Sequence, residues 1–248
     1  MNEMNAFKNI LGRIFALWAM LVFVSSMLIA IFFAWIIGLW PEPERSHKMQ
    51  IVFSVWMNFF FTLTGVRRIF KGRKEFKKGE TYIVVCNHNS FMDPPLSSPG
   101  IPAANKTIAK VEMSRIPLFG IVYKRGSVLV DRKSEDSRKQ SYAQMKKVLD
   151  MGLHMCIYPE GTRNKTSEPL RPFHDGAFRL AVETGKPIIP AVLFYTKKVL
   201  PADKTFSFWP HKVEMHFLPP ISSVGKQTQQ LKEEVFGLMK AYYLDNLD

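Results

Sequence analysis

The sequence predicts an α/β protein, a mixed sheet covered by helices, with an apolar two-helix membrane hairpin at its amino-terminal end. From about residue 79, short runs rich in β-branched residues alternate with runs of helical periodicity, as in chains that alternate strands and helices. Before that point lie two uncharged segments that are too long for strands. A length of 248 residues suits one domain of ordinary size with an attachment.

The first uncharged segment extends from Ile14 to Trp40, between the charges of Arg13 and Glu42. As a helix it would be roughly 40 Å long at about 1.5 Å per residue, more than the hydrocarbon core of a bilayer requires. It is also much longer than the apolar region of a signal peptide. We therefore expect a membrane helix here. A buried helix of a soluble protein is the alternative, and the length disfavours it.

The second uncharged segment extends from Gln50 to Val66, after a turn over residues 41–45. At about 17 residues it is at the lower limit for crossing a bilayer. Four polar residues also interrupt it, so it either crosses or lies part-way in one leaflet. Together the two segments predict a hairpin over residues 1–66.

A strongly basic segment follows the hairpin. Residues 67–79 contain seven lysines and arginines and a single glutamate, and we expect a juxtamembrane linker. Basic residues beside a membrane segment mark its cytoplasmic side and attract anionic lipid. Lys8 and Arg13 place the amino terminus on the same side. We expect a cytoplasmic (inner) membrane protein whose domain over residues 80–248 faces the cytoplasm. The alternative for the basic segment is a solvated linker that does not contact lipid.

The net charge of +13 and the pI of about 9.7 favour an acidic partner. Nucleic acid, an anionic membrane surface and phosphorylated substrates all meet that description. No sequence signature of an RNA- or DNA-binding module accompanies the charge, so we expect the membrane bilayer as a partner and no nucleic acid.

Five short apolar runs predict the strands of the domain. They are Thr81–Cys86, Ser127–Val130, His154–Tyr158, Ile188–Phe194 and Val213–Leu218. Cys86 and Cys156 lie in two of these runs, which predicts buried and inert thiols, and two cysteines do not make a disulfide framework.

Apolar stripes at helical spacing predict three helices. The stripes are Tyr142, Met145 and Leu149; Phe178, Ala181 and Val182; and Leu231, Val235, Leu238 and Tyr242. The first helix is expected to begin near Ser134 or Ser137, since serine is a favoured N-cap. The second is expected between a cap at Asp175 and a stop at Gly185.

A polar loop, Asn87 to Asp93, follows the first strand of the domain. Ligand sites in α/β folds usually lie at such strand ends. A loop of this length can bring the Asp93 carboxylate to the His88 ring. That contact would fix the histidine tautomer and leave its other nitrogen free to accept a proton. The alternative is an ordinary polar turn whose histidine caps a helix or faces water.

Three further polar clusters interrupt the apolar pattern. They contain Lys110, then Asp131-Arg132, and then Pro159-Glu160-Gly161-Thr162-Arg163. An arginine directly after a strand-and-glycine turn can offer a two-pronged guanidinium to a phosphate, and a lysine adds a point charge. Each cluster alone is also compatible with an ordinary turn that contains a salt bridge.

Taken in series, these clusters resemble the glycerolipid acyltransferase family, and within it the bacterial lysophosphatidic acid acyltransferases. Four motifs match in order, over roughly residues 80–195. The matching segments are His88 to Asp93 preceded by Asn87, Gly126 to Arg132, Pro159 to Arg163, and Ile188-Ile189-Pro190.

The resemblance implies acyl transfer from acyl-CoA or acyl carrier protein to the sn-2 hydroxyl of lysophosphatidic acid, giving phosphatidic acid in phospholipid synthesis. No cofactor or metal is expected, since the thioester is a co-substrate. His88 would be the general base and Asp93 its orienting partner. Arg163 and Lys110 would hold the acceptor's phosphate, with Arg132 as a third candidate. Asn87, Glu160, Gly161, Thr162 and Pro190 would support these motifs.

Other readings of the same residues remain open at this point. Glycerol-3-phosphate or another lysolipid could be the acceptor instead. Cys86 is the nearest rival nucleophile, although residues two apart on a strand lie roughly 7 Å apart, too far for an activating hydrogen bond to His88. Ser90 lacks the elbow motif of a hydrolase nucleophile, and a zinc site lacks paired ligand spacings. A membrane-tethered module that binds anionic ligands without catalysis is the alternative from another class.

Overall fold

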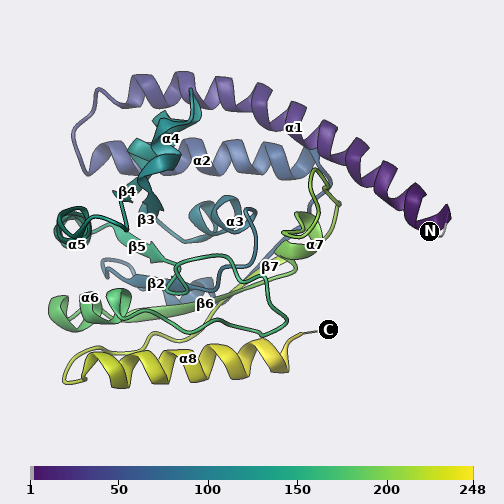
Figure 1. The fold of residues 1–248 in the computed structure, drawn as a ribbon. Coiled ribbons are helices and arrows are strands. Elements are labelled where there is room, and N and C mark those ends of the chain that lie inside the picture. The colour runs from purple at the N-terminus through teal and green to yellow at the C-terminus, as the bar shows by residue number, and fades with distance from the viewer. Residues whose placement is uncertain (1–2, 248) are drawn as a thin grey trace.

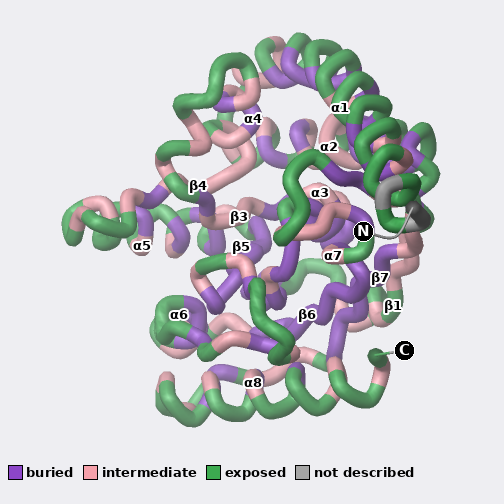
Figure 2. The backbone as a smooth tube through the Cα atoms, turned by 45° about the vertical axis from the view of Figure 1, so that its right-hand side comes forward, coloured by how far each residue is buried: buried purple, intermediate pink, exposed green. Residues whose placement is uncertain are grey.

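The computed structural model describes residues 3–247 and contains a seven-stranded sheet with helices on both faces (Figures 1 and 2). The predicted α/β class is confirmed. The strands are β1 Arg68–Lys71, β2 Ile83–Cys86, β3 Asn105–Lys110, β4 Ser127–Val130, β5 His154–Ile157, β6 Ile188–Phe194 and β7 Val213–Phe217. The α-helices are α1 Glu3–Ile37, α2 Glu44–Leu63, α3 Asp93–Gly100, α4 Phe119–Gly126, α5 Glu135–Asp150, α6 Gly176–Thr184, α7 Thr196–Val199 and α8 Thr228–Asp245.

The strand order is β1-β7-β6-β2-β5-β3-β4, and every neighbouring pair is parallel except β6 and β7. The carboxyl ends of β2, β3, β4, β5 and β6 therefore lie on the same side of the sheet, where the strands end. From β2 the chain crosses to β3 on one side, whereas from β6 it continues to β7 on the other. The edge between β2 and β6 is thus a topological switch point, where α/β sheets bind their ligands.

Two apolar cores flank the sheet. Val84, Cys86 and Ile189 belong to the core that the sheet shares with α1, α2 and α3. Ile83 and Val85 point to the opposite face and belong to the core that the sheet shares with α5, α6 and α8. Strands β2, β5, β6 and β7 are buried along their whole length, whereas the helices expose their outer surfaces (Figure 2). Strands buried on both faces explain why the sequence shows continuous apolar runs rather than alternation.

The predicted strands are all present, and β4 and β6 have the predicted bounds. Two strands are absent from the prediction. β3 carries Asn105, Lys106 and Thr107, and it is only partly buried, so its sequence has no apolar run. β1 lies inside the basic segment that was expected to be a linker, and it pairs with β7 at the edge of the sheet. An edge strand tolerates such charges because one side faces solvent.

The helices start and end close to the predicted positions. Ser134 is the N-cap of α5, and its Oγ accepts a hydrogen bond from Ser137 N at 3.2 Å. Asp175 precedes α6 as expected, although its carboxylate pairs with Lys232 of α8 at 2.7 Å instead of capping the helix. The stripe predicted for α8 is wrong at Leu238, which is 39% exposed, because Met239 takes the buried place.

Pro190 occupies a central strand although it lacks the N–H that a ladder needs. Its carbonyl accepts a hydrogen bond from Leu218 N at 2.9 Å, on the β7 side. In an antiparallel ladder the N–H of a residue points to the same neighbour as its carbonyl. The missing donor therefore faces the end of the β6–β7 ladder, beyond the Ala191–Phe217 pair, and the parallel ladder to β2 stays intact.

The hairpin of α1 and α2 lies across the top of the molecule in Figure 1. Small residues of α1, among them Ala16, Ala19, Ala30 and Ala34, are buried and allow close packing. Larger apolar residues of α1 are exposed on its outer side: Ile14, Leu17, Leu21, Leu28, Phe32 and Trp35. Within residues 3–247, one helix, over Phe7–Ile37, is long and apolar enough to cross a membrane.

The far end of the hairpin is fastened to the α/β domain. In the turn between the helices, Glu42 accepts hydrogen bonds from Lys106 of β3 at 2.7 Å, Ser46 at 2.6 Å and Arg45 at 2.9 Å. One turn further on, Gln50 of α2 donates to the Ser98 carbonyl of α3 at 2.8 Å. The hairpin therefore runs alongside the domain and does not project away from it.

The Glu42–Lys106 contact predicts a measurable contribution to stability. Burial by itself raises the pKa of Glu42, but hydrogen bonds from Lys106, Ser46 and Arg45 outweigh it and lower the pKa from 4.5 to about 2. The carboxylate thus stabilises the fold above pH 4.5, and its contribution is lost as the pH falls toward 2. At neutral pH, Glu42→Gln should lower the free energy of unfolding by about 1.5–3 kcal/mol.

Denaturant titration measures this effect, and Lys106→Met should couple to Glu42→Gln so that the double variant loses less than the sum. Lys139→Met is the matched control, because its pair with Glu135 is 72% and 70% exposed. Exposed pairs of this kind contribute about 1 kcal/mol at most. Additive losses from Glu42→Gln and Lys106→Met would show that the two side chains do not interact.

Candidate active site

The loop after β2 places His88 and Asp93 at the switch point of the sheet. The apolar pattern of β2 stops at Cys86, and α3 begins at Asp93. Pro94 lies in the first turn of α3, where proline costs no hydrogen bond because the first helical N–H groups have no partner within the helix. The short segment between strand and helix returns on itself, so that Asp93 faces His88.

The expected contact between the two side chains is present. His88 Nδ1 lies 2.8 Å from Asp93 Oδ2. The same oxygen accepts hydrogen bonds from Asn89 N at 2.5 Å and Ser90 N at 2.7 Å, and Asp93 is fully buried. Because a carboxylate only accepts hydrogen bonds, this geometry favours the proton on Nδ1 and leaves a lone pair on Nε2.

The His88 ring is held from the side and remains accessible. It lies over the ring of Tyr158, with 4.6 Å between the centroids, and the Tyr158 hydroxyl is hydrogen-bonded to Ser97 Oγ at 2.6 Å. The His88 side chain is 18% exposed. Its Nε2 has no hydrogen-bond partner within residues 3–247. The ring is thus oriented on one side and available on the other.

Glu160 holds the backbone of this loop. Its two oxygens accept from His88 N at 2.7 Å and from Arg171 N at 3.0 Å. Burial raises the pKa of Glu160, and the hydrogen bonds from the two backbone N–H groups oppose that rise. The backbone of the same turn adds a second link, since Asn164 N donates to the His88 carbonyl at 2.6 Å.

Asn87 fastens the start of the loop to β6. Its Nδ2 donates to the Leu193 carbonyl at 3.0 Å, and its Oδ1 accepts from Leu193 N at 2.7 Å. Both residues are fully buried. Asn87 therefore extends the β2–β6 pairing by one side chain beyond the end of β2.

Gly161 is required where the second polar turn passes the ring of His174. Its φ of +69° is in the left-handed region, and an added Cβ would lie 2.9 Å from His174 Cδ2. The carbonyl of Gly161 accepts a hydrogen bond from Arg132, and Thr162 beside it is exposed. Arg132, expected as a third phosphate ligand, is thus positioned to brace this turn.

Arg163 and Lys110 have no carboxylate partner within residues 3–247. The guanidinium of Arg163 stacks on the ring of Phe91 at 3.5 Å from the centroid. Phe91 belongs to the His88 loop, so the stack joins the two polar turns. Lys110 is exposed at the end of β3, whose neighbour β5 leads into the turn that carries Arg163.

Two residues of the site were not predicted from the sequence. Phe91 is 57% exposed, and nothing in a linear pattern indicates that it supports Arg163. Lys197 lies in α7, the short helix after β6, and its Nζ donates to the Thr166 carbonyl at 3.2 Å. Burial lowers the pKa of Lys197, while the charges of Glu160 and Asp93 act in the opposite direction. Its position shortly after a predicted strand, which ends at Phe194, was the available signal.

The structure disfavours the rival nucleophiles. Cys86 is fully buried 3.8 Å from the sulfur of Cys156, and burial raises the pKa of the Cys86 thiol well above its usual range. Only a thiolate is a strong nucleophile, and this environment disfavours the thiolate form of Cys86, so Cys86 is unsuited to be the nucleophile. Ser90 is also fully buried, and its hydroxyl donates to the Leu200 carbonyl at 2.8 Å. Chemically, the site offers an oriented imidazole base beside unpaired cations.

Comparison with known proteins gives a consistent result. The acyltransferase family model matches residues 67–193. The chain is 32% identical over 170 residues to the 1-acyl-sn-glycerol-3-phosphate acyltransferase alpha of Mus musculus, which covers 66% of this chain and 58% of the mouse protein. It is 28% identical over 199 residues to the 1-acyl-sn-glycerol-3-phosphate acyltransferase of Borreliella burgdorferi, covering 80% of this chain and 76% of that protein. The chain thus spans little more than half the length of the mouse relative.

A solved structure has a similar fold along its whole length. The crystal structure of the 1-acyl-sn-glycerophosphate (LPA) acyltransferase from Thermotoga maritima aligns with a TM-score of 0.82 at 22% identity. The alignment covers 96% of this chain and 97% of that one, so it includes the hairpin as well as the sheet. At this identity the likeness concerns the fold.

The two hydrogen bonds of Asn87 predict a large stability effect. Asn87→Ala would leave the N–H and the carbonyl of Leu193 unpaired in a fully buried place, so the free energy of unfolding should fall by about 2–4 kcal/mol. Asn89→Ala is a matched control in the same loop, because the Asn89 side chain is buried and its Oδ1 has no partner. Denaturant titration compares them. Equal losses from both changes would contradict the bridging role of Asn87.

Proposed function

Because this chain belongs to the acyltransferase family, we propose that it transfers an acyl chain from a thioester, acyl-CoA or acyl carrier protein, to the sn-2 hydroxyl of lysophosphatidic acid. The product is then phosphatidic acid. The names of the relatives support this acceptor. The observation that carries the chemistry is the 2.8 Å contact between His88 Nδ1 and Asp93 Oδ2.

In this reaction His88 acts as the general base. An alcohol is a poor nucleophile, and removal of its proton during attack by a positioned imidazole accelerates the step by about 10²–10⁴-fold. Nε2 takes the hydroxyl proton while the oxygen forms a bond to the thioester carbonyl carbon. The C–S bond then breaks, and the imidazolium returns the proton to the departing sulfur. Asp93 stabilises the imidazolium between these events.

Arg163 and Lys110 hold the phosphate of the acceptor. A guanidinium offers two parallel hydrogen bonds to phosphate oxygens, and an ammonium adds a compact charge. The stack on Phe91 restricts the Arg163 guanidinium to one plane beside the His88 loop. The phosphate thereby places the lipid hydroxyl near Nε2. Arg132 contributes indirectly, through its hydrogen bond to the Gly161 carbonyl.

The hairpin brings this site to its substrate. Acceptor and product are bilayer lipids, and lifting an acyl chain into water costs about 0.8 kcal/mol per CH₂ group. The apolar outer side of α1 is suited to insertion into the cytoplasmic leaflet. The contact of Glu42 with Lys106 keeps the whole hairpin beside the α/β domain. The site then works at the membrane surface, on the side marked by the basic residues of 67–79.

The function is tested with purified protein, lysophosphatidic acid and a labelled acyl-CoA. His88→Ala should reduce kcat by about 10²–10⁴-fold through loss of the base. Cys86→Ala should keep most of the activity, since this thiol is buried outside the reaction. A panel with glycerol-3-phosphate and other lysolipids identifies the acceptor. Formation of no phosphatidic acid by the native protein, or loss of activity in Cys86→Ala with His88→Ala still active, would overturn the assignment.

The role of Phe91 is tested separately. Phe91→Ala should raise KM for the phosphorylated acceptor about two- to five-fold, because an exposed cation–π contact contributes about 0.5–1 kcal/mol. KM for the acyl donor should stay near the native value, and Phe91→Tyr should restore the acceptor KM.

Arg163→Ala should raise the acceptor KM further, and adding Phe91→Ala to it should have little effect. A Phe91→Ala variant that changes both KM values equally, or that acts equally in the Arg163→Ala background, would contradict the stacking role.

A further inference from the structure

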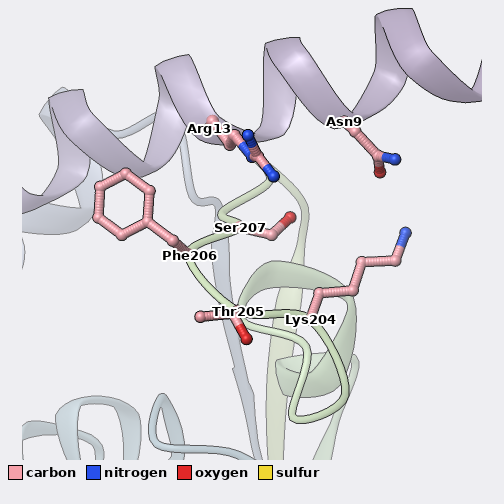
Figure 3. Close-up of a pocket in the computed structure, with 6 residues that line it drawn as sticks. All are labelled: Asn9, Arg13, Lys204, Thr205, Phe206 and Ser207. Carbon is pink, nitrogen blue, oxygen red and sulfur yellow. The ribbon is translucent and has the colours of Figure 1, made fainter.

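A polar cavity lies between the amino-terminal part of α1 and the loop after α7. It has a volume of about 320 Å³ and is lined by Asn9, Arg13, Lys204, Thr205, Phe206 and Ser207. Figure 3 shows Asn9 and Arg13 extending from the helix, and Lys204 and Ser207 from the loop, around the same space. None of these residues belongs to the four motifs.

The charge of this cavity is uncompensated. Neither Arg13 nor Lys204 has an ion-pair partner within the described part of the chain, residues 3–247. The amide of Asn9 and the hydroxyl of Ser207 add hydrogen-bonding groups without opposing charge. The cavity thus offers a guanidinium fork, an ammonium and neutral polar groups. These are the donors that bind phosphate oxygens.

The walls of the cavity are fixed to each other. Phe208 N donates to the Gly12 carbonyl of α1 at 3.1 Å. The approach is close, because a Cβ on Gly12 would lie 2.9 Å from Ser207 Oγ. The Phe15 and Trp209 rings pack beside it with 5.8 Å between centroids. Arg13 and Lys204 are therefore held on facing elements, and they do not belong to a mobile tail.

Exposed apolar side chains lie on the two elements that form the cavity. Ile10 and Ile14, one helical turn apart on α1, are 57% and 54% exposed, and Phe206 on the loop is 43% exposed. The long apolar segment of α1 begins at Ile14. A ligand that fits both features carries a phosphate and apolar chains. Inorganic phosphate or a nucleotide would leave these side chains in water.

We propose that this cavity binds the phosphate of an anionic phospholipid of the bilayer, whose acyl chains lie along α1. Arg13 and Lys204 contact the phosphate oxygens, and Asn9 and Ser207 donate to the remaining ones. The inference rests on the membrane association proposed above and not on acyl transfer, because binding requires neither the donor nor His88. The lipid is thus a structural ligand at a position separate from the acceptor.

The loop after α7 also contacts the segment that supports the His88 loop. Trp209 N donates to the Val199 carbonyl at 2.8 Å, and the next residue, Leu200, accepts the hydrogen bond of Ser90. A headgroup between α1 and this loop thus sits one short segment away from the residues that orient Asp93.

Co-sedimentation with phosphatidylcholine vesicles, with and without phosphatidylglycerol, tests the proposal on the full chain at physiological salt. The double variant Arg13→Gln/Lys204→Gln should bind phosphatidylglycerol vesicles about ten- to thirty-fold more weakly than the native protein. Binding to pure phosphatidylcholine should be unchanged. Both residues are at the surface, and matching melting curves verify that the variant folds.

Two controls separate a defined cavity from general attraction of a basic protein. Lys147→Gln/Lys240→Gln removes the same charge from α5 and α8, on the other face of the sheet, and should weaken binding by about two-fold or less. Arg13→Lys keeps the charge but loses the fork, and should weaken binding about three-fold or more. Equal losses in the two double variants, or native binding by Arg13→Lys, would overturn the proposal.

A titration with inorganic phosphate alone distinguishes the source of the phosphate. Weak binding, at millimolar concentrations or above, agrees with a lipid site that needs the acyl chains. Micromolar binding that disappears in Arg13→Gln/Lys204→Gln would identify a site for soluble phosphate and contradict the lipid assignment. Failure of the proposed acyl transfer would leave all these binding results in place, so the two proposals fail separately.

Discussion

One carboxylate oxygen organises this protein. Asp93 Oδ2 accepts hydrogen bonds from His88 Nδ1, Asn89 N and Ser90 N. The two backbone contacts fix the curve of the loop, and the third fixes the histidine ring, so the shape of the loop and the tautomer of His88 have a common cause. A buried carboxylate is costly unless such partners surround it. The same arrangement therefore stabilises the charge of Asp93 and directs the lone pair of Nε2 outward.

The surrounding structure keeps that arrangement in place. Asn87 ties the start of the loop to β6, and Glu160 ties its backbone to the turn after β5. Both partners come from strands that neighbour β2, so the parallel sheet brings together residues that are about seventy to one hundred positions apart. Phe91 then links the loop to Arg163. The carboxyl ends of the strands thus bring together the proposed base, its proposed orienting group and a cation.

The sequence predicted features that depend on local pattern, and it missed those that depend on tertiary partners. β4 and β6 have continuous apolar runs, and Ser134 has the chemistry of an N-cap, so these were predicted correctly. β3 is polar because it is half-exposed, and β1 is hidden in a basic segment, so neither has a local signal. The site motifs were visible as His88, Asp93 and Arg163. Phe91 and Lys197 were not, since their importance comes from neighbours far along the chain. The contact of Glu42 with Lys106 likewise joins two unrelated segments.

The central claim is that Asp93 holds His88 with its proton on Nδ1 and its lone pair on Nε2. Selective ¹⁵N labelling of the histidines tests it directly at a pH where His88 is neutral, with His88→Asn used to assign the signals. We expect a protonated Nδ1 and an unprotonated Nε2, and a mixture of tautomers in Asp93→Asn. A native His88 that carries its proton on Nε2, or a tautomer that is unchanged in Asp93→Asn, would contradict it.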